Sequence, residues 1–160
     1  MGQLFEGDGE LPAQLAAGPG GVGNELDGLG RADELGVTLE LICGAPVPAV
    51  WTDPFKLRQV LINLVANALE AAGGGGRVEL GLEPEGEGVA FVVRDNGPGV
   101  PAEHLERVFE PFFTTKETGK GSGLGLFVSQ RLMERLGGRL TLTSRYGQGA
   151  ALRAWLPLVP

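Results

Sequence analysis

The sequence of 160 residues predicts an α/β fold of two layers, in which one mixed sheet carries helices over one face. Two long segments, residues 55–72 and 125–136, repeat their apolar side chains with the period of a helix. Each is followed by a strand-like pair, over residues 77–94 and 139–156. Because helices alternate with hairpins, the order does not fit a right-handed βαβ repeat throughout.

Composition places the chain among globular proteins, since 42% of its residues are hydrophobic and 21% are charged. A formal net charge of −7 argues against sequence-independent binding to nucleic acid, which needs a basic surface. The single cysteine, Cys43, cannot form an internal disulfide, so we expect a reducing, cytoplasmic setting. No signal peptide is visible and no stretch approaches the roughly 20 apolar residues of a membrane span, so we expect no membrane contact by this chain.

Glycine-rich residues 1–36 show little hydrophobic periodicity, and we expect an N-terminal arm or linker remnant that is helical at best over residues 25–35. Residues 37–160 are expected to form the domain. Its first strand is predicted over residues 37–43, where apolar and polar residues alternate.

The next element is the first long helix. Asp53 is a plausible N-cap with Pro54 at the first helical position, and the four glycines at 73–76 end the helix. We then expect, in chain order, strands over 77–83 and 89–94, a short helix over 102–108, a helix over 125–136, and a terminal hairpin of 139–144 and 149–156.

Two faces are predicted for the helix over residues 55–72. The apolar face, expected to pack on the sheet, holds Leu57, Val60, Leu61, Leu64, Val65 and Ala68. The polar face holds Lys56, Gln59, Asn63, Asn67 and Glu70. Asn63 and Asn67 lie one turn apart, and they are either part of a solvated face or amide ligands that complete a Mg²⁺ shell. The helix alone favours the solvated face, whereas the poor helix propensity of asparagine argues for the second interpretation.

Two glycine-rich runs suit a nucleotide. Asp95 opens the run Asp-Asn-Gly-Pro-Gly, where it either forms the turn or accepts a hydrogen bond from a ligand amine such as that of adenine. The run Gly-Ser-Gly-Leu-Gly-Leu over residues 121–126 opens a helix, where unpaired N–H groups and the positive dipole end favour phosphate.

Between these runs, residues 109–116 hold three of the seven phenylalanines. They are predicted to anchor a loop in the core, to form a lid that carries Lys116 toward phosphates, or both. His104, the single histidine, lies in a polar stretch and is expected to be a solvated surface residue. Neither a zinc-binding cluster nor a Ser-His-Asp arrangement is evident.

Four motifs occur in order within residues 37–157: 57–68 (LRQVLINLVANA), 95–99 (DNGPG), 109–116 (FEPFFTTK) and 119–126 (GKGSGLGL). They resemble the N, G1, F and G2 boxes of the ATP-binding catalytic domain of sensor histidine kinases. That family shares its nucleotide fold with type II topoisomerases, the Hsp90 chaperones and mismatch-repair ATPases. The resemblance implies a two-layer sandwich of Bergerat type, with a mixed, mostly antiparallel sheet and helices covering one face.

The same resemblance implies ATP and Mg²⁺ as cofactors. Asn67 would coordinate Mg²⁺, Asn63 would support the phosphate side and act in catalysis with Lys116, and Asp95 would bind the adenine amine. The implied ATP-binding residues are Asn63, Asn67, Asp95, Gly97, Gly99, Val100, Phe112, Phe113, Lys116, Gly121, Ser122, Gly123, Leu124, Gly125 and Leu126.

The implied function is transfer of the γ-phosphoryl group to a histidine on a dimerisation and phosphoacceptor domain, with a response regulator as a further partner. The alternatives are an ATP-gated protein-binding module without kinase activity and an anti-sigma-type serine kinase, although the long aromatic F box argues against the latter. The sequence departs from the family in having no acceptor hairpin motif and in Ala150 where threonine is frequent. Glu70 stands where many members carry a basic residue, although the Asn-Ala-Leu-Glu-Ala form of residues 67–71 is familiar in kinases of the nitrogen-regulation type.

Overall fold

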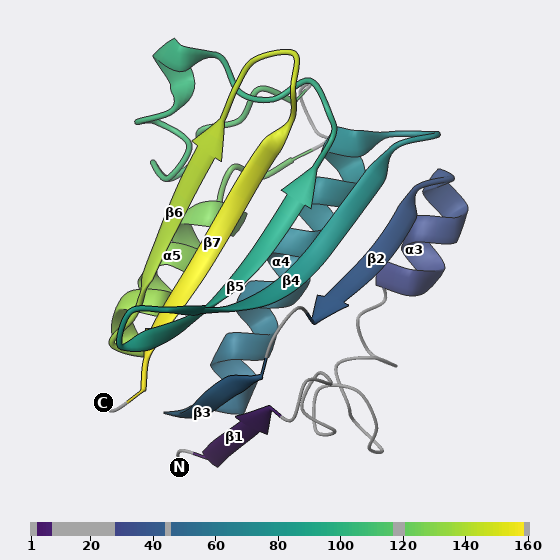
Figure 1. The fold of residues 1–160 in the computed structure, drawn as a ribbon. Helices are drawn as coiled ribbons and strands as arrows, with labels where there is room; N and C mark the ends of the chain where they lie inside the picture. Colours follow the sequence, from purple (N-terminus) through teal and green to yellow (C-terminus); the bar gives the residue numbers. More distant parts are fainter. Residues whose placement is uncertain (1–2, 8–27, 44–45, 117–120, 159–160) are drawn as a thin grey trace.

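A computed structural model describes residues 3–7, 28–43, 46–116 and 121–158 of the chain. Its elements are β1 (Gln3–Gly7), α3 (Gly28–Leu35), β2 (Thr38–Cys43), β3 (Val47–Thr52), α4 (Pro54–Ala72), β4 (Arg77–Glu85), β5 (Gly88–Asp95), the 3₁₀ turn η1 (Ala102–His104), α5 (Gly125–Arg135), β6 (Arg139–Ser144) and β7 (Ala150–Pro157). Figure 1 shows them along the chain.

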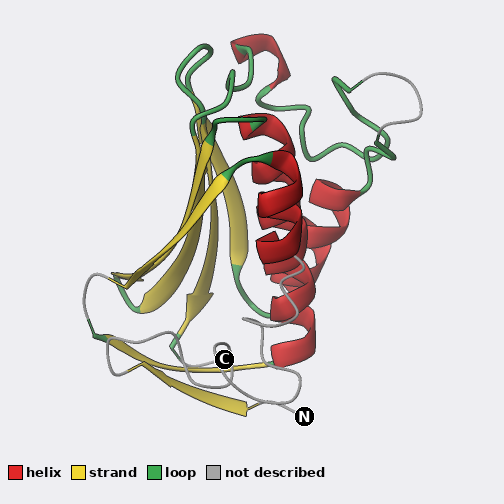
Figure 2. Ribbon diagram, turned by 90° about the vertical axis from the view of Figure 1, so that its right-hand side faces the viewer, coloured by secondary structure: helices red, strands yellow, loops and turns green. Residues whose placement is uncertain are grey.

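Five strands form one twisted sheet in the order β2-β4-β5-β7-β6. Only the β2–β4 pair is parallel, and the other three pairs are antiparallel. Figure 2 shows the sheet edge-on, with the helices gathered on one of its faces. The predicted two-layer fold with a mixed, mostly antiparallel sheet is therefore confirmed.

The helix α4 packs its apolar face on the sheet as its periodicity predicts. All six residues predicted for that face are buried, and Leu69 joins them. Asp53 caps the helix, because its Oδ1 accepts hydrogen bonds from the backbone N–H groups of Phe55 at 3.0 Å and Lys56 at 3.2 Å. At the other end, α4 stops at Ala72, where the glycine run begins.

The structure differs from the predicted elements in three places. Strands β1 and β3 were not predicted, and they pair with each other as a separate two-stranded sheet beside the start of α4 (Figure 1). The predicted helix over 102–108 is wrong beyond His104, because only the 3₁₀ turn η1 forms there. The β4–β5 turn is tighter than the predicted 84–88, since both strands extend inward to Glu85 and Gly88.

Part of the segment predicted as an N-terminal arm is the helix α3. Its Ala32 is 3% exposed and belongs to the core, and Leu35 packs against that core. Glycine-rich residues 8–27 lie outside the described residues.

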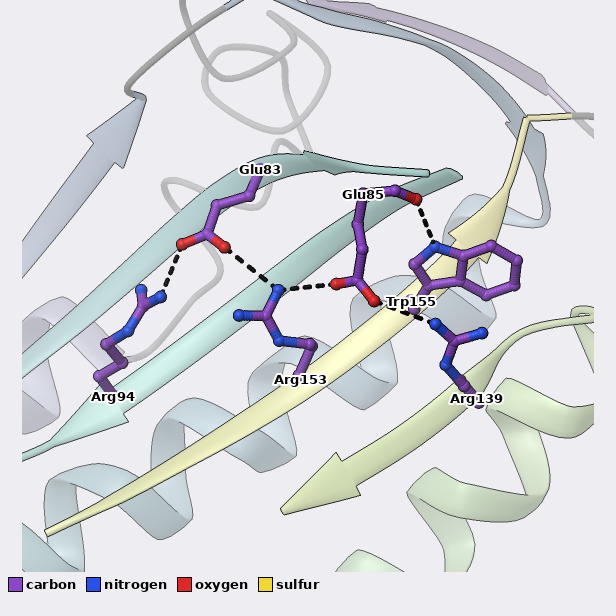
Figure 3. Close-up of polar contacts among 6 residues, drawn as sticks. All are labelled: Glu83, Glu85, Arg94, Arg139, Arg153 and Trp155. Atoms are coloured by element: carbon purple, nitrogen blue, oxygen red, sulfur yellow. Dashed lines mark hydrogen bonds and ion pairs between the residues drawn. The ribbon is translucent and has the colours of Figure 1, made fainter. Parts of the chain in front are cut away.

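The other face of the sheet carries a row of ion pairs, drawn in Figure 3. Arg153 of β7 lies between two carboxylates of β4, 3.1 Å from Glu83 and 2.7 Å from Glu85. Arg94 of β5 extends the row on one side, and Arg139 of β6 extends it on the other. The hydrogen bond from Arg94 holds the pKa of Glu83 below its usual value. The hydrophobic core therefore lies on the opposite face of the sheet, under the helices.

Among the residues that the structure describes, no helix has the length and apolar character needed to cross a membrane.

Candidate functional site

The polar face of α4 forms the floor of the candidate site. Asn63, Asn67 and Glu70 follow one another along this face, and each is half-buried. The Asn63 amide nitrogen donates a hydrogen bond to the Ser129 hydroxyl of α5 at 2.9 Å. Because the amide nitrogen donates this hydrogen bond, the amide oxygen Oδ1 is left as the acceptor.

The start of α5 lies directly against Asn63. A Cβ atom added at Gly125 would lie only 2.5 Å from the Asn63 Oδ1 atom. Only glycine lets the backbone approach so closely, so the predicted phosphate-binding run lies over the Asn63 side chain. The side chain of Ser122, within the same run, accepts a hydrogen bond from the Leu124 N–H at 3.3 Å.

The acidic turn lies at the far end of α4. Asp95 ends β5, and its Oδ1 accepts a hydrogen bond from the Gly97 N–H at 2.9 Å. A Cβ at Gly97 would lie 2.4 Å from the Ala71 carbonyl oxygen, so the turn touches the last turn of α4. Burial raises the pKa of Asp95, opposed in part by hydrogen bonds from the Gly97 and Ala150 N–H groups. The half-buried carboxylate therefore favours a partner that donates a hydrogen bond.

A hydroxyl group that the sequence did not single out supports this turn from behind. Ser144, the last residue of β6, accepts a hydrogen bond from the Val100 N–H at 2.8 Å. It also donates one to the Gly149 carbonyl oxygen at 2.8 Å. Ser129 and Ser144 both lack a motif of their own, and only their position in regular elements next to motif residues signals them.

The predicted lid, residues 109–116, is fixed at some points and exposed at others. Phe109 packs against the core, and the Phe113 ring lies 4.6 Å below the Arg107 guanidinium. Phe112, in contrast, is 73% exposed and has a φ of 65°, a strained backbone conformation for a bulky residue. Its N–H donates to the Gly123 carbonyl at 2.9 Å, which joins the lid to the glycine run.

Lys116 contacts α4 from the end of this segment. Its ammonium group forms an ion pair with Glu70, which also pairs with Arg31 of α3. Residues 117–120, between Lys116 and the glycine run, lie outside the described residues.

His104 is not the solvated surface residue that its polar neighbourhood predicted. It is half-buried, its ring lies edge-on to that of Phe113 at 5.3 Å, and its Nδ1 is buried without a hydrogen-bond partner among the described residues. The ring of Phe113, a residue of the predicted lid, packs against His104, and the local sequence does not reveal this contact.

The predicted site residues thus fall into two groups along α4. Asn63 lines a cleft of about 420 Å³ with Phe55, Arg58, Gln59, Ile62 and Ala66. Asp95 also lines a separate cleft of about 260 Å³ with Arg77, Glu79, Arg94 and Asn96, and Arg94 belongs to the ion-paired face of the sheet that points away from α4. The glycine run joins the Asn63 group through Gly125, while Gly97, Gly99 and Val100 join the Asp95 group. Lys116 contacts α4 at Glu70 and the glycine run at Gly121. Asn67 lies between the two groups on the helix.

The side chains at the site suit a metal ion whose ligands come mainly from a bound nucleotide and water. Asn67 makes no side-chain hydrogen bond to the described part of the chain, so its amide oxygen is available. Within the same residues, no group of three or more histidine, cysteine, aspartate or glutamate side chains is placed to hold a metal. A single amide oxygen fits Mg²⁺ when phosphate and water supply its other ligands.

Comparison with known proteins places this geometry in a family. Residues 52–160 match the family of histidine kinase-, DNA gyrase B- and HSP90-like ATPases. The chain is 37% identical over 122 residues to the sensor histidine kinase ZraS of Escherichia coli K12, covering 76% of this chain and 26% of ZraS. It is 43% identical over 129 residues to the two-component sensor PprA of Pseudomonas aeruginosa, covering 75% of this chain and 14% of PprA. The chain therefore spans about a quarter of ZraS and less of PprA.

Solved structures of histidine kinases resemble this fold. The nucleotide-free catalytic domain of the histidine kinase ThkA superposes with a TM-score of 0.74 at 31% identity, covering 86% of this chain and 90% of that domain. Full-length ShkA, solved in complex with AMPPNP, superposes with a TM-score of 0.74 at 34% identity, covering 84% of this chain and 28% of ShkA.

Proposed function

The chain belongs to the family of histidine kinase-, DNA gyrase B- and HSP90-like ATPases as an ATP-binding catalytic domain of the sensor histidine kinase type, and we propose that it transfers the γ-phosphoryl group of ATP to a histidine of a phosphoacceptor domain. A response regulator is the proposed recipient of that group in turn. The proposal places the domain in the cytoplasm, where ATP is available.

One observation carries the proposed site: the glycine run at the start of α5 lies against the polar face of α4. Backbone N–H groups of residues 121–125 are proposed to bind the phosphates, aided by the positive end of the α5 dipole. Asn67 would hold Mg²⁺, which would neutralise phosphate charge when bound. At the other end of α4, the Asp95 carboxylate would accept a hydrogen bond from the adenine amine.

The chemistry of Asn63 favours transfer to a protein over hydrolysis. An amide is too weakly basic to accept a proton near neutral pH, so Asn63 cannot act as the general base that activates water. In the proposed step, an imidazole nitrogen of the acceptor histidine attacks the γ-phosphorus, and the bond to the β–γ bridging oxygen breaks. ADP leaves with that electron pair, while Lys116 balances the negative charge on the transferred group.

The acceptor histidine is not His104, which is packed against Phe113. The decisive experiment therefore supplies an acceptor. The chain is incubated with Mg²⁺, ATP labelled on the γ-phosphate and the dimerisation and phosphoacceptor hairpin of a related sensor kinase. We expect acid-labile label on the histidine of the hairpin, and Lys116→Ala should reduce the transfer rate about tenfold or more.

Arg131→Ala is the matched control, because it removes one positive charge from a surface pair with Glu134. Acid-stable label on serine would instead indicate a serine kinase of the anti-sigma type. Tight ATP binding with no label on any hairpin tested would contradict transfer and indicate an ATP-gated binding module.

A further inference from the structure

Glu70 places a negative charge on the polar face of α4. It lies one turn beyond Asn67, the proposed Mg²⁺ ligand, on the polar face of α4. A carboxylate beside the proposed metal site repels the phosphates that the metal would bind. The arrangement therefore needs cations close to Glu70.

Two cations from distant segments meet at this carboxylate. One oxygen of Glu70 pairs with Arg31 of α3, and the other pairs with Lys116 of the predicted lid. Arg31 precedes residues 52–160, the region that matches the family, so the family match does not include it. Three segments of the chain are thus joined through one side chain.

Lys116 is also adjacent to the glycine run. A Cβ atom added at Gly121 would lie 3.0 Å from the Lys116 Cδ atom. The lysine stem therefore lies alongside the proposed phosphate site while its ammonium group is held by Glu70. A rotation about the side-chain bonds of Lys116 moves the charge from one to the other.

The ion pairs are weak enough to exchange. The side chains of Lys116 and Glu70 are 38% and 28% exposed, so water screens their attraction. A phosphate group with more than one negative charge competes successfully for the same ammonium group.

We propose that Glu70 is a positioning residue that holds Lys116 in the absence of nucleotide, and that Arg31 neutralises Glu70 once Lys116 has turned to the phosphates. This inference rests on the proposed function. It assigns to α3 a part in nucleotide binding: Arg31 lets an acidic residue remain beside the triphosphate.

The proposal predicts how two substitutions combine. Arg31→Ala leaves Glu70 without its remaining cation, so the affinity for ATP with Mg²⁺ falls roughly threefold to tenfold. Glu70→Gln removes both the repulsion and the competitor for Lys116, so the affinity rises by a few fold. In the Glu70→Gln background, Arg31→Ala has no further effect, because the charge that Arg31 neutralises is gone.

Isothermal titration calorimetry on the full chain measures each affinity, with thermal unfolding to verify that the variants are folded. Adenosine is the control ligand: it lacks phosphates, so its affinity is the same in all variants. Arg131→Ala is the control variant with the same change in net charge, and Arg31→Lys restores wild-type binding.

The outcomes distinguish a failure of the proposed function from a failure of the roles proposed for Arg31 and Glu70. If the wild-type chain binds no ATP, the proposed function fails. If it binds ATP but Arg31→Ala binds as tightly as wild type, or remains weak in the Glu70→Gln background, the role of Arg31 is refuted. If Glu70→Gln weakens binding of ATP with Mg²⁺, Glu70 acts as a ligand or a structural residue, and its role as a competitor for Lys116 is refuted.

Discussion

At the scale of single residues, Asp95 lowers the stability of the fold at neutral pH and has a proposed role in binding adenine. Burial raises its pKa, which means that the fold disfavours its charged form. A carboxyl whose pKa is higher in the folded state favours folding when it is protonated, and this contribution is lost as the pH rises through that pKa. At neutral pH, the ionised Asp95 therefore lowers the stability of the domain.

Asp95→Asn is expected to weaken ATP binding and to stabilise the fold at pH 7. The proposed hydrogen bond from the adenine amine to a charged acceptor is worth about 1.5–3 kcal/mol, so we expect roughly a tenfold to hundredfold loss of affinity. The amide oxygen retains the hydrogen bond from the Gly97 N–H, so the turn is preserved. Calorimetry measures the affinity, and urea unfolding measures the stability.

The gain in stability should disappear in acid, below the ordinary Asp pKa of about 3.9, where the wild-type carboxyl is itself protonated. Equal affinity for ATP in the two proteins would contradict the assignment of Asp95 to the adenine site. A variant that is less stable than wild type at pH 7 would show that the hydrogen bonds to the carboxylate outweigh its burial.

At the scale of the elements, α4 joins the core to the site. One face is buried against the sheet, and the other carries Asn63, Asn67 and Glu70. The position of all three depends on where the helix begins, and that point is set by Asp53. Lys56 also donates a side-chain hydrogen bond to Asp53 at 2.5 Å, which is the main cause of the lowered pKa of Asp53.

Asp53→Ala is expected to lower the free energy of unfolding at pH 7 by about 1 kcal/mol, the usual effect of losing an N-cap. Because the folded pKa of Asp53 is lowered, its contribution is present above the unfolded value of about 3.9 and is lost as the pH falls through the folded value. The difference between variant and wild type should therefore shrink between pH 5 and acid, as urea unfolding at each pH would reveal.

Asp53→Asn is the matched control, because it keeps the capping oxygen without the charge. It should be nearly as stable as wild type at pH 7, with less dependence on pH. A loss as large in Asp53→Asn as in Asp53→Ala would show that the charge, and not the cap, stabilises the start of α4.

Elements defined by local pattern were predictable from the sequence. The period of α4 and its capping residues located that helix almost to the residue, and apolar runs bounded by glycine-containing turns located the hairpins. Strands β1 and β3 were missed because β1 lies in a glycine-rich segment with little hydrophobic periodicity and because Pro48 interrupts the pattern of β3. Their pairing joins residues 40 or more positions apart, such as Gly7 with Val47.

The candidate site likewise contains some features that the sequence reveals and others that only the tertiary fold creates. Glycine runs and the asparagine pair were readable as motifs, although their assignment to ATP stays a proposal. The covering of His104 by Phe113, the hydrogen bond from Asn63 to Ser129 and the meeting of Arg31 with Glu70 all join residues far apart in the sequence or across a loop. Only the tertiary fold brings them together.

At the scale of the whole molecule, α3 closes one side of the helical layer. It lies beside β2 and packs against α4 (Figure 1), with Ala32 buried at the contact. The predicted domain boundary at residue 37 removes this helix, while a boundary at residue 28 keeps it. The two boundaries therefore have different physical consequences.

A fragment of residues 28–160 is expected to be more stable than one of residues 37–160 by about 1–3 kcal/mol, because Ala32 and Leu35 of α3 bury apolar surface against the core. Thermal unfolding of the two fragments measures the difference. Because only the longer fragment contains Arg31, it should also bind ATP more tightly. Identical unfolding temperatures would show that α3 is an appendage and that the domain begins at residue 37.

The parallel strand β2 has a further consequence for work with this protein. It pairs with β4 from Thr38 opposite Arg77 to Cys43 opposite Leu82, and it precedes residue 52, where the family match begins. A truncation at that point strips β4 of its neighbour and leaves its amide and carbonyl groups as an open template for strands of other molecules. Such a preparation would aggregate, and its failure to bind ATP would reflect a damaged sheet margin rather than a defective nucleotide site.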